Sequence, residues 1–211
     1  MEPQHIFPDR EDLNIENNLR KKLAAYQPQE RGDYSLNPEL FLPPPYRPAA
    51  VLIPLLKRDT GYTVLFTQRT AHLNAHAGQI SFPGGGADKT DRDSAVTALR
   101  EAEEEIGLVP HNVEILGALD HYITRTGYRV APVVGLIKTP QEWKPDSFEV
   151  EKIFEVPLDY ILSPAALVRK KVTLEGRERD FYALTWQDFY IWGATAGMLR
   201  NFVDVIGDER L

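Results

Sequence analysis

The chain has 211 residues, of which 43% are hydrophobic, and a formal net charge of −7 at pH 7. This size and composition predict a folded domain with a sizeable core, and the absence of cysteine excludes disulfides, thiolate catalysis and cysteine metal sites. The acidic balance argues against a nucleic-acid binder, which needs clustered lysines and arginines. The longest apolar run, residues 49–56, is far shorter than the roughly 20 residues that span a bilayer, and the N-terminus has no basic and apolar leader. We therefore expect a cytoplasmic protein with a small-molecule partner, no membrane contact and no nucleic acid.

The N-terminal part of the chain predicts a helix followed by an arm. Apolar residues recur at helical spacing between Ile15 and Tyr26, and six prolines then fall within residues 27–48. Clustered prolines favour an extended, ordered segment, and long segments of this kind often carry function. A lid over the site and a contact in a homodimer both stay open as roles. The expected organisation is a helical and proline-rich arm over residues 1–48 and a hydrolase domain over 49–211.

Runs of β-branched and alternating apolar residues predict strands after the arm. The first two runs, residues 49–57 and 62–69, are joined by a turn at 58–61 and predict a hairpin. Further strands are predicted at residues 113–121, 128–137, 149–156, 168–174 and 181–185.

Two further helices are predicted between and after these strands. The first ends at Ile106, because Gly107 is a typical residue just beyond a helix, and either Asp91 or Asp93 caps its start. The last helix is predicted over residues 189–205. Several antiparallel strands with a few helices predict an α+β layered fold.

The predicted helix that ends at Ile106 contains four glutamates. At about 100° per residue, Glu101, Glu104 and Glu105 share one arc, and this arc is separate from the apolar stripe that should face the core. Glu103 falls on the other flank and is predicted to be a solvated bystander. The stripe consists of Ala95, Leu99, Ala102 and Ile106.

Local physics opposes this arrangement of charge. Glu101 and Glu105 repel each other as i,i+4 neighbours by roughly 0.2–0.5 kcal/mol, and both lie near the negative end of the helix dipole. A bound hard cation such as Mg²⁺ or Mn²⁺ would turn this repulsion into a net attraction, and Arg100 could orient one carboxylate. The preceding triplet Gly84–Gly86 lets backbone groups approach a ligand, because no Cβ intervenes. A solvated acidic face and a tight glycine turn are the alternative interpretations.

The spacing of these residues resembles the Nudix box, G-x5-E-x7-R-E-U-x-E-E-x-G-U, in which U is aliphatic. Gly86 is followed by thirteen residues and then by Arg100–Leu108, R-E-A-E-E-E-I-G-L. One position departs, because Arg92 stands where the box has its first glutamate. In the family that glutamate supports the helix and the arginine more than it holds metal, so the resemblance still implies an active enzyme.

A second signature lies upstream of the box. Leu65–Thr70, then Gly78 and Phe82–Gly85, resemble the pattern L-L-T-x-R-[SA]-x3-R-x3-G-x3-F-P-G-G of the coenzyme A diphosphatases, a subfamily of the Nudix hydrolases. Asn74 stands where this pattern has an arginine, so a cation that could contact the substrate is missing.

The resemblance to this subfamily continues at residues 154–158 and 190–197 and so covers roughly residues 49–205. It implies an α/β/α sandwich with a mixed sheet. It also implies metal-dependent hydrolysis of the pyrophosphate bond of coenzyme A, or of its acyl or oxidised forms. The products would be 4′-phosphopantetheine, or its acyl form, and adenosine 3′,5′-bisphosphate.

By position, the resemblance also assigns roles to individual residues. The catalytic residues would be Glu101, Glu104, Glu105 and Arg100. Mg²⁺ or Mn²⁺ would be held by Glu101 and Glu105, with Glu104 assisting and the carbonyl of Gly86 completing the set. The substrate-binding residues would be Arg69, His76, Gly84 and Gly85. The general base would be Glu101 or a carboxylate from a later loop such as Glu149.

Two other functions stay open. The missing arginine at Asn74 favours a related substrate, an oxidised nucleoside triphosphate or another nucleoside diphosphate derivative. The second alternative is an inactive nucleotide-binding module. The intact Glu101, Glu104 and Glu105 speak against it, because a binding module has no need of clustered charges that cost stability.

Overall fold

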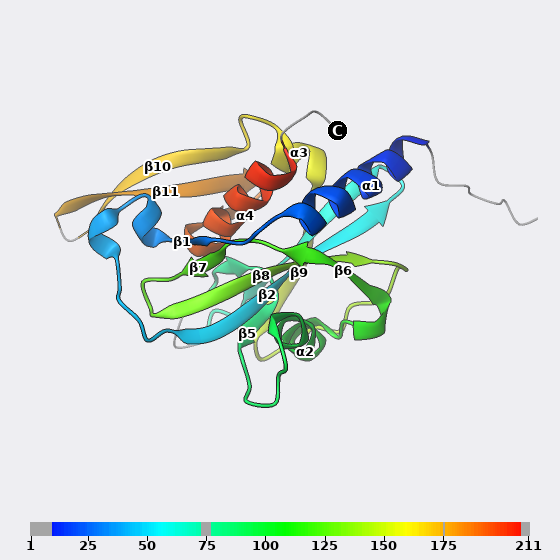
Figure 1. Cartoon of the computed structure of the whole chain (residues 1–211), viewed down its shortest axis with the longest axis horizontal. Coiled ribbons are helices and arrows are strands. Elements are labelled where there is room, and N and C mark those ends of the chain that lie inside the picture. Colours follow the sequence, from blue (N-terminus) through cyan, green and yellow to red (C-terminus); the bar gives the residue numbers. More distant parts are fainter. Residues whose placement is uncertain (1–9, 73–76, 175, 208–211) are drawn as a thin grey trace, which may run out of the picture.

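The computed structural model describes residues 10–72, 77–174 and 176–207, which form two sheets and four α-helices (Figure 1). The larger, mixed sheet contains β1 (Glu30–Gly32), β2 (Arg47–Arg58), β3 (Gly61–Arg69), β4 (Ile80–Ser81), β5 (Gly84–Gly86), β6 (Val113–Ala118), β7 (His121–Ile123), β8 (Tyr128–Ile137) and β9 (Val150–Pro157). The smaller sheet is antiparallel and contains β10 (Leu167–Leu174), β11 (Arg177–Trp186) and β12 (Phe189–Trp192). The helices are α1 (Arg10–Ala25), α2 (Ser94–Ile106), α3 (Leu158–Leu162) and α4 (Gly193–Ile206), with 3₁₀ turns η1 (Asp33–Ser35), η2 (Pro38–Leu40) and η3 (Pro110–Asn112).

Strand β2 lies at the centre of the large sheet and organises it. On one side β2 runs parallel to β8 along ten residue pairs, from Arg47 with Tyr128 to Leu56 with Ile137. On the other side its C-terminal half pairs with β3, while its N-terminal half pairs with the glycine triplet of β5. The triplet therefore sits beside the central strand, next to the start of α2.

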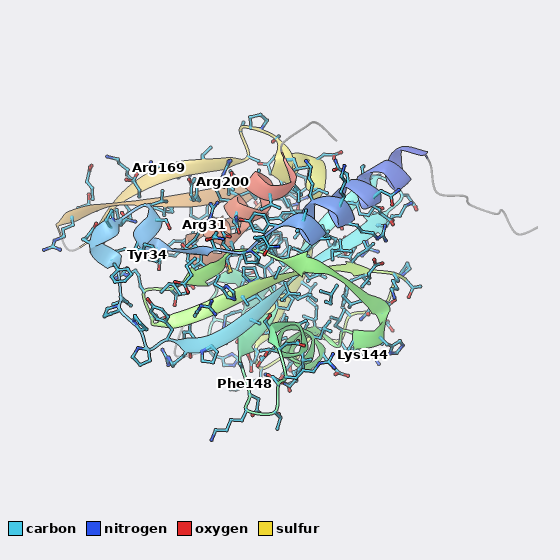
Figure 2. The ribbon with its side chains drawn as sticks, in the orientation of Figure 1. Arg31, Tyr34, Lys144, Phe148, Arg169 and Arg200 are labelled. Carbon is cyan, nitrogen blue, oxygen red and sulfur yellow. The ribbon has the colours of Figure 1, made fainter. Side chains whose placement is uncertain are left out.

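The large sheet lies between helices on both faces. Alternation along β2 sends Leu52 into a cluster under α2 with Ala102 and Ile106, and sends Ile53 into the opposite cluster with Phe202 of α4. Figure 1 shows α2 below the sheet and α1 and α4 above it. In Figure 2, Lys144 and Phe148 lie on the α2 side, and Arg169 and Arg200 lie on the side of β10 and α4. This is the α/β/α sandwich with a mixed sheet that the sequence predicted.

The arm is tied to the sheet at a buried carboxylate. Asp120, whose side chain is 3% exposed, accepts hydrogen bonds from the Tyr26 hydroxyl, the Gln29 N–H and Arg31 Nε, at 2.7, 2.7 and 2.5 Å. Just beyond Gln29, β1 pairs in parallel with β7. The residues of the arm from Tyr26 to Arg31 are thus part of the packed structure. The division at residue 48 stays a prediction about domain organisation.

Two predicted elements differ from the structure. The last helix was predicted from residue 189, but Phe189–Trp192 form β12 and the helix starts at Gly193. Tyr190 and Trp192 are 40% and 45% exposed while Ile191 is fully buried, which is the two-residue period of a strand. The strand predicted over residues 113–121 is divided into β6 and β7. Within the described residues, no helix is long and apolar enough to cross a membrane.

Candidate active site

The carboxylate-bearing helix α2 has a defined start and end. The Asp93 side chain accepts a hydrogen bond from the Val96 N–H at 2.9 Å and so caps the helix. Gly107 follows Ile106 with φ of 67°, a left-handed conformation that glycine adopts without strain. Of the two predicted capping residues, Asp93 is therefore the one that caps the helix. The predicted stop at Gly107 is confirmed.

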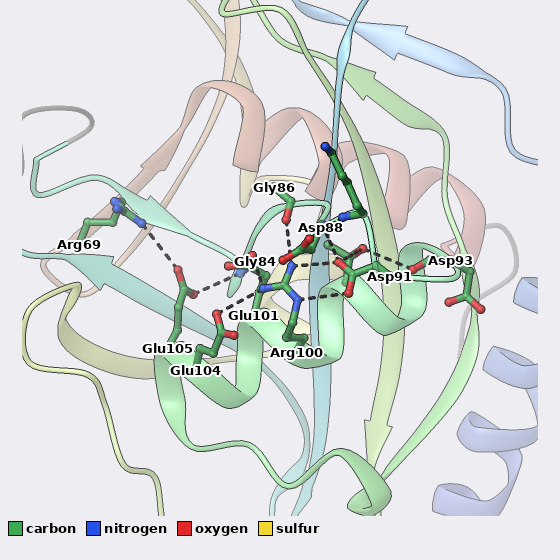
Figure 3. A network of polar contacts seen from close by, with 12 residues as sticks. Arg69, Gly84, Gly86, Asp88, Asp91, Asp93, Arg100, Glu101, Glu104 and Glu105 are labelled. Carbon is green, nitrogen blue, oxygen red and sulfur yellow. Dashed lines mark hydrogen bonds and ion pairs between the residues drawn. The ribbon is translucent and has the colours of Figure 1, made fainter.

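Glu105 is buried where α2 meets the glycine triplet. Its side chain is 7% exposed; Oε2 accepts the Gly84 N–H at 3.2 Å, and Oε1 lies 3.6 Å from Arg69 Nη1 (Figure 3). Burial raises the pKa of Glu105 to about 8; Gly84 and Arg69 oppose this rise, and the charges of Glu149 and Glu101 add to it. Helical spacing alone gave no sign of this burial, because the covering atoms come from β3 and β5.

Glu101 lies against the backbone of the same triplet. A Cβ built on Gly85 would stand 2.3 Å from Glu101 Oε2, so only glycine leaves room for this carboxylate. Burial raises the pKa of Glu101, and the adjacent Arg100 guanidinium opposes the rise. Glu104 has a side chain that is 62% exposed, and Glu103 is exposed as predicted. The structure thus brings Glu101 and Glu105 to the glycine triplet and leaves Glu104 at the rim.

Arg100 connects the helix to the glycine triplet. Its Nη1 donates to Glu101 Oε1 at 2.8 Å and to Glu104 Oε2 at 3.3 Å, and its Nη2 donates to the Gly86 carbonyl at 2.9 Å (Figure 3). One guanidinium therefore fixes two carboxylates relative to the β5 backbone. This is the orienting role that the sequence suggested for Arg100, extended to the loop.

Asp91 holds Arg100 from the other side. Arg100 Nε and Nη2 donate to the two Asp91 carboxylate oxygens at 3.2 and 3.0 Å, and Thr97 Oγ1 donates to Oδ2 at 2.9 Å. The Arg100 guanidinium holds the pKa of Asp91 at about 2, well below its usual range, and the Asp88 N–H adds to this effect. The Asp91 side chain is 4% exposed, whereas that of Arg92 is 83% exposed.

The residue just before Arg92, Asp91, thus gives Arg100 a carboxylate partner. Sequence reasoning considered Asp91 only as a helix cap and missed its pairing with Arg100. The signal was present, because Asp91 is the acidic residue adjacent to the departing Arg92.

A loop carboxylate joins the site next to Arg69. Arg69 Nη2 lies 3.5 Å from Glu149 Oε2. Thr70 fixes the loop that carries Glu149, because its N–H donates to the Glu149 carbonyl at 3.0 Å and its Oγ1 donates to the Phe148 carbonyl at 2.7 Å. Arg69 therefore lies between Glu105, with which it forms an ion pair, and Glu149, to which it donates a long hydrogen bond. Two predicted positions, His76 and Asn74, lie outside the described residues.

The donor set of this site suits a hard cation, although the carboxylates are not yet gathered around one point. In the part of the chain that the structure describes, no three acidic, histidine or cysteine side chains are arranged to hold a metal ion. Arg100 instead neutralises Glu101 and Glu104. Burial raises the pKa of Glu101, beside Gly85, and of Glu105, beside Gly84, so the charged form of each carboxylate is poorly solvated. A divalent cation would stabilise these charged forms, because Mg²⁺ and Mn²⁺ prefer carboxylate oxygen ligands.

Comparison with known proteins identifies the family. The NUDIX domain family matches residues 45–176, more than half of the chain. The chain belongs to the Nudix family. It is 39% identical over 183 residues to a Pectobacterium atrosepticum protein described as "Uncharacterized Nudix hydrolase NudL", which covers 84% of this chain and 95% of the relative. The Escherichia coli K12 protein of the same description is 39% identical over 162 residues, covering 77% of this chain and 84% of the relative.

Among solved structures, a "MutT/nudix family protein" from Enterococcus faecalis covers 94% of this chain and 73% of its own, with a TM-score of 0.48 and 15% identity. As a Nudix hydrolase, the chain has its box arginine and glutamates, Arg100 to Glu105, within the matched region.

Proposed function

We propose that this Nudix hydrolase cleaves the pyrophosphate bond of coenzyme A, or of its acyl or oxidised forms, with the help of a divalent cation. The observation that carries the proposal is the contact between two motifs. Arg69 and Gly84, both from the segment that resembles the coenzyme A diphosphatases, contact Glu105 of the Nudix box at 3.6 and 3.2 Å. The residues that would recognise the substrate and those that would cleave it therefore converge at one carboxylate.

The chain's own residues divide the work in this proposal. Glu101 and Glu105 would hold Mg²⁺ or Mn²⁺ and Glu104 would assist from the rim, while Arg100 keeps Glu101 beside the glycine triplet. A bound divalent cation supplies Lewis acidity to the phosphoryl oxygens. Arg69, which already faces two carboxylates, binds a phosphate of the substrate by charge and hydrogen bonding.

The reaction needs one base. Water attacks one phosphorus atom of the anhydride, the bond from that phosphorus to the bridging oxygen breaks, and the other phosphate leaves with the bridging oxygen. The proton released by the water goes to a carboxylate, either Glu101 or Glu149. Glu149 lies 3.5 Å from Arg69 and Glu101 adjoins the glycine triplet, so each carboxylate contacts a residue that would bind the substrate in this proposal. A rate profile against pH for Glu149→Gln distinguishes them, since only loss of the base removes the acidic limb of that profile.

The test is chromatography of coenzyme A incubated with the purified protein and Mg²⁺ or Mn²⁺. We expect adenosine 3′,5′-bisphosphate and 4′-phosphopantetheine to appear with metal and to be absent with EDTA. An intact coenzyme A peak under all metal conditions would contradict the proposal. Hydrolysis of coenzyme A in the presence of EDTA would contradict the role of the cation but would agree with coenzyme A as the substrate.

One alternative substrate class follows from Asn74. An arginine is expected there in the coenzyme A pattern, so another nucleoside diphosphate derivative or an oxidised nucleoside triphosphate is the second candidate. The turnover of a panel of these compounds, compared with that of coenzyme A at equal concentration, shows which of the two substrate classes the protein prefers. Asn74→Arg should raise coenzyme A turnover selectively if the missing cation limits its binding.

A further inference from the structure

A second recess lies apart from the carboxylate helix. It has a volume of about 540 Å³ and is enclosed by η2 of the arm, β8, the small sheet and the first turn of α4. Its apolar wall residues Ile80 and Val130 belong to the core cluster on the α4 face of the large sheet. Small-molecule sites have volumes of about 300–1,000 Å³ and occur where separate elements meet, so this recess has the size and position of one.

Three aromatic side chains line the recess. Trp192 of β12 lines it and is 45% exposed, although tryptophan is normally well covered. The ring of Phe181, directly on the neighbouring strand, meets the Trp192 ring edge to face at 6.0 Å and holds it in place. Tyr128 adds a third ring to the lining. A flat, apolar ligand ring would cover the exposed indole without moving the wall.

The polar groups of the recess favour a ligand with acceptor atoms. Arg179 has a side chain only 11% exposed; its Nη1 binds Glu39 at 2.9 Å, and its buried Nε has no partner among the described residues. Arg125 also lines the recess. The two acids of the lining are already engaged: Asp33 accepts from the Tyr122 hydroxyl and from the Arg125 N–H, and Asp180 accepts from Arg169. Arg125 and Arg179 are thus the two cationic side chains of the lining, and a phosphate group would meet them by charge.

The recess is joined to the carboxylate site through a short segment of chain. Thr195 Oγ1, in the first turn of α4, donates to the Ile80 carbonyl at 3.0 Å. From Ile80 the chain passes through Phe82 and Pro83 to Gly84, whose N–H binds Glu105. One end of this segment therefore lines the recess and the other end shapes the hydrolytic site.

We propose that this recess binds the purine nucleotide half of the substrate, with the base stacked on Trp192 and a phosphate facing Arg179. The inference rests on the proposed function, because it assigns one half of a nucleotide-containing pyrophosphate to a site of its own. It also gives the arm a role, since η2 forms one wall of the recess.

The test is calorimetric titration of the full-length protein with adenosine 3′,5′-bisphosphate and, separately, with 4′-phosphopantetheine. Trp192→Ala should weaken the bisphosphate about tenfold, the usual effect of removing a stacking ring, and leave 4′-phosphopantetheine unaffected. Trp192→Phe should retain most of the affinity. The matched control is Tyr190→Ala, which removes an equally exposed ring of the same strand that does not line the recess.

Each outcome bears on one proposal or the other. Equal bisphosphate affinity for Trp192→Ala and wild type, with matching melting temperatures, overturns the recess as the nucleotide site. Equal weakening by Tyr190→Ala also overturns it, because the effect would then come from the sheet as a whole. Selective weakening by Trp192→Ala, in a protein that leaves coenzyme A intact, supports the recess and contradicts the proposed substrate.

Discussion

Glu105 provides the sharpest test of the site's electrostatics, through the stability of the metal-free protein. In the folded state its pKa is about 8, raised mainly by burial, against an ordinary value of 4.5. Between these two values the folded chain holds a proton that the unfolded chain has released. Stability therefore falls as pH rises through this window, because the folded state must keep a proton that the unfolded state releases. Glu105→Gln is neutral at every pH and removes this penalty.

The size of the effect follows from the shift. A pKa unit corresponds to about 1.4 kcal/mol, so the shift from 4.5 to about 8 sets an upper limit of roughly 4–5 kcal/mol for the penalty at alkaline pH. We expect metal-free Glu105→Gln to match wild type near about pH 4 and to be more stable by a few kcal/mol near about pH 9. The same variant should lose hydrolytic activity, so stability and activity move in opposite directions at this one residue.

The assay is urea unfolding in EDTA at several pH values, with the difference between variant and wild type taken at each. Other titrating groups are common to both proteins and cancel in that difference. Mg²⁺ at about 100 times its dissociation constant should stabilise wild type by about 2.7 kcal/mol and stabilise the variant much less. A difference that stays constant from acid to alkaline pH would refute the reasoning, since Glu105 would then titrate as an exposed carboxylate does.

Two predictions concern the groups that position Glu101. Gly85→Ala should lower activity by about 10–100-fold, because its Cβ would occupy the place of the Glu101 carboxylate, while Gly86→Ala, whose Cβ meets no heavy atom within 4 Å, should cost far less. Steady-state rates at saturating substrate check this, and equal losses would contradict it. Asp91→Asn should reduce kcat by about tenfold or more by loosening the arginine that orients Glu101, whereas Arg92→Ala should behave like wild type. A larger loss for Arg92→Ala than for Asp91→Asn would show that the box position itself matters.

Periodicity predicted the elements whose burial follows a simple repeat. The strand predicted over residues 128–137 coincides with β8, because a strand buried on both faces is a continuous apolar run. The stop at Gly107 was equally predictable, since a left-handed residue after a helix favours glycine. Residues 189–192 were predicted to belong to the last helix, but they form β12. A two-residue alternation over four positions is too short to separate from a helical pattern.

The site was predictable in its residues and not in its environment. The spacing of Glu101 and Glu105 predicted that both carboxylates project from one side of α2, and the structure has them so. Glu105 is covered by Arg69 of β3 and Gly84 of β5, and Glu101 lies against Gly85 of β5; both strands are placed near α2 by their pairing with β2. A helical wheel contains no information about such neighbours. The docking of the loop at Glu149 likewise depends on hydrogen bonds between distant segments.

The pairing of Asp91 with Arg100 illustrates how a motif and an ion pair differ in what they require. A sequence motif fixes positions along the chain, whereas Arg100 requires only an acceptor pair at the right place in space. The residues before the Asp93 cap are not helical, so their side chains do not follow the helix's angular repeat, and neighbouring positions can present a carboxylate to the same point. Here Asp91 turns inward, held by Thr97 and by the Asp88 N–H, and Arg92 turns outward. Arg100 therefore has a buried carboxylate partner although position 92 is an arginine.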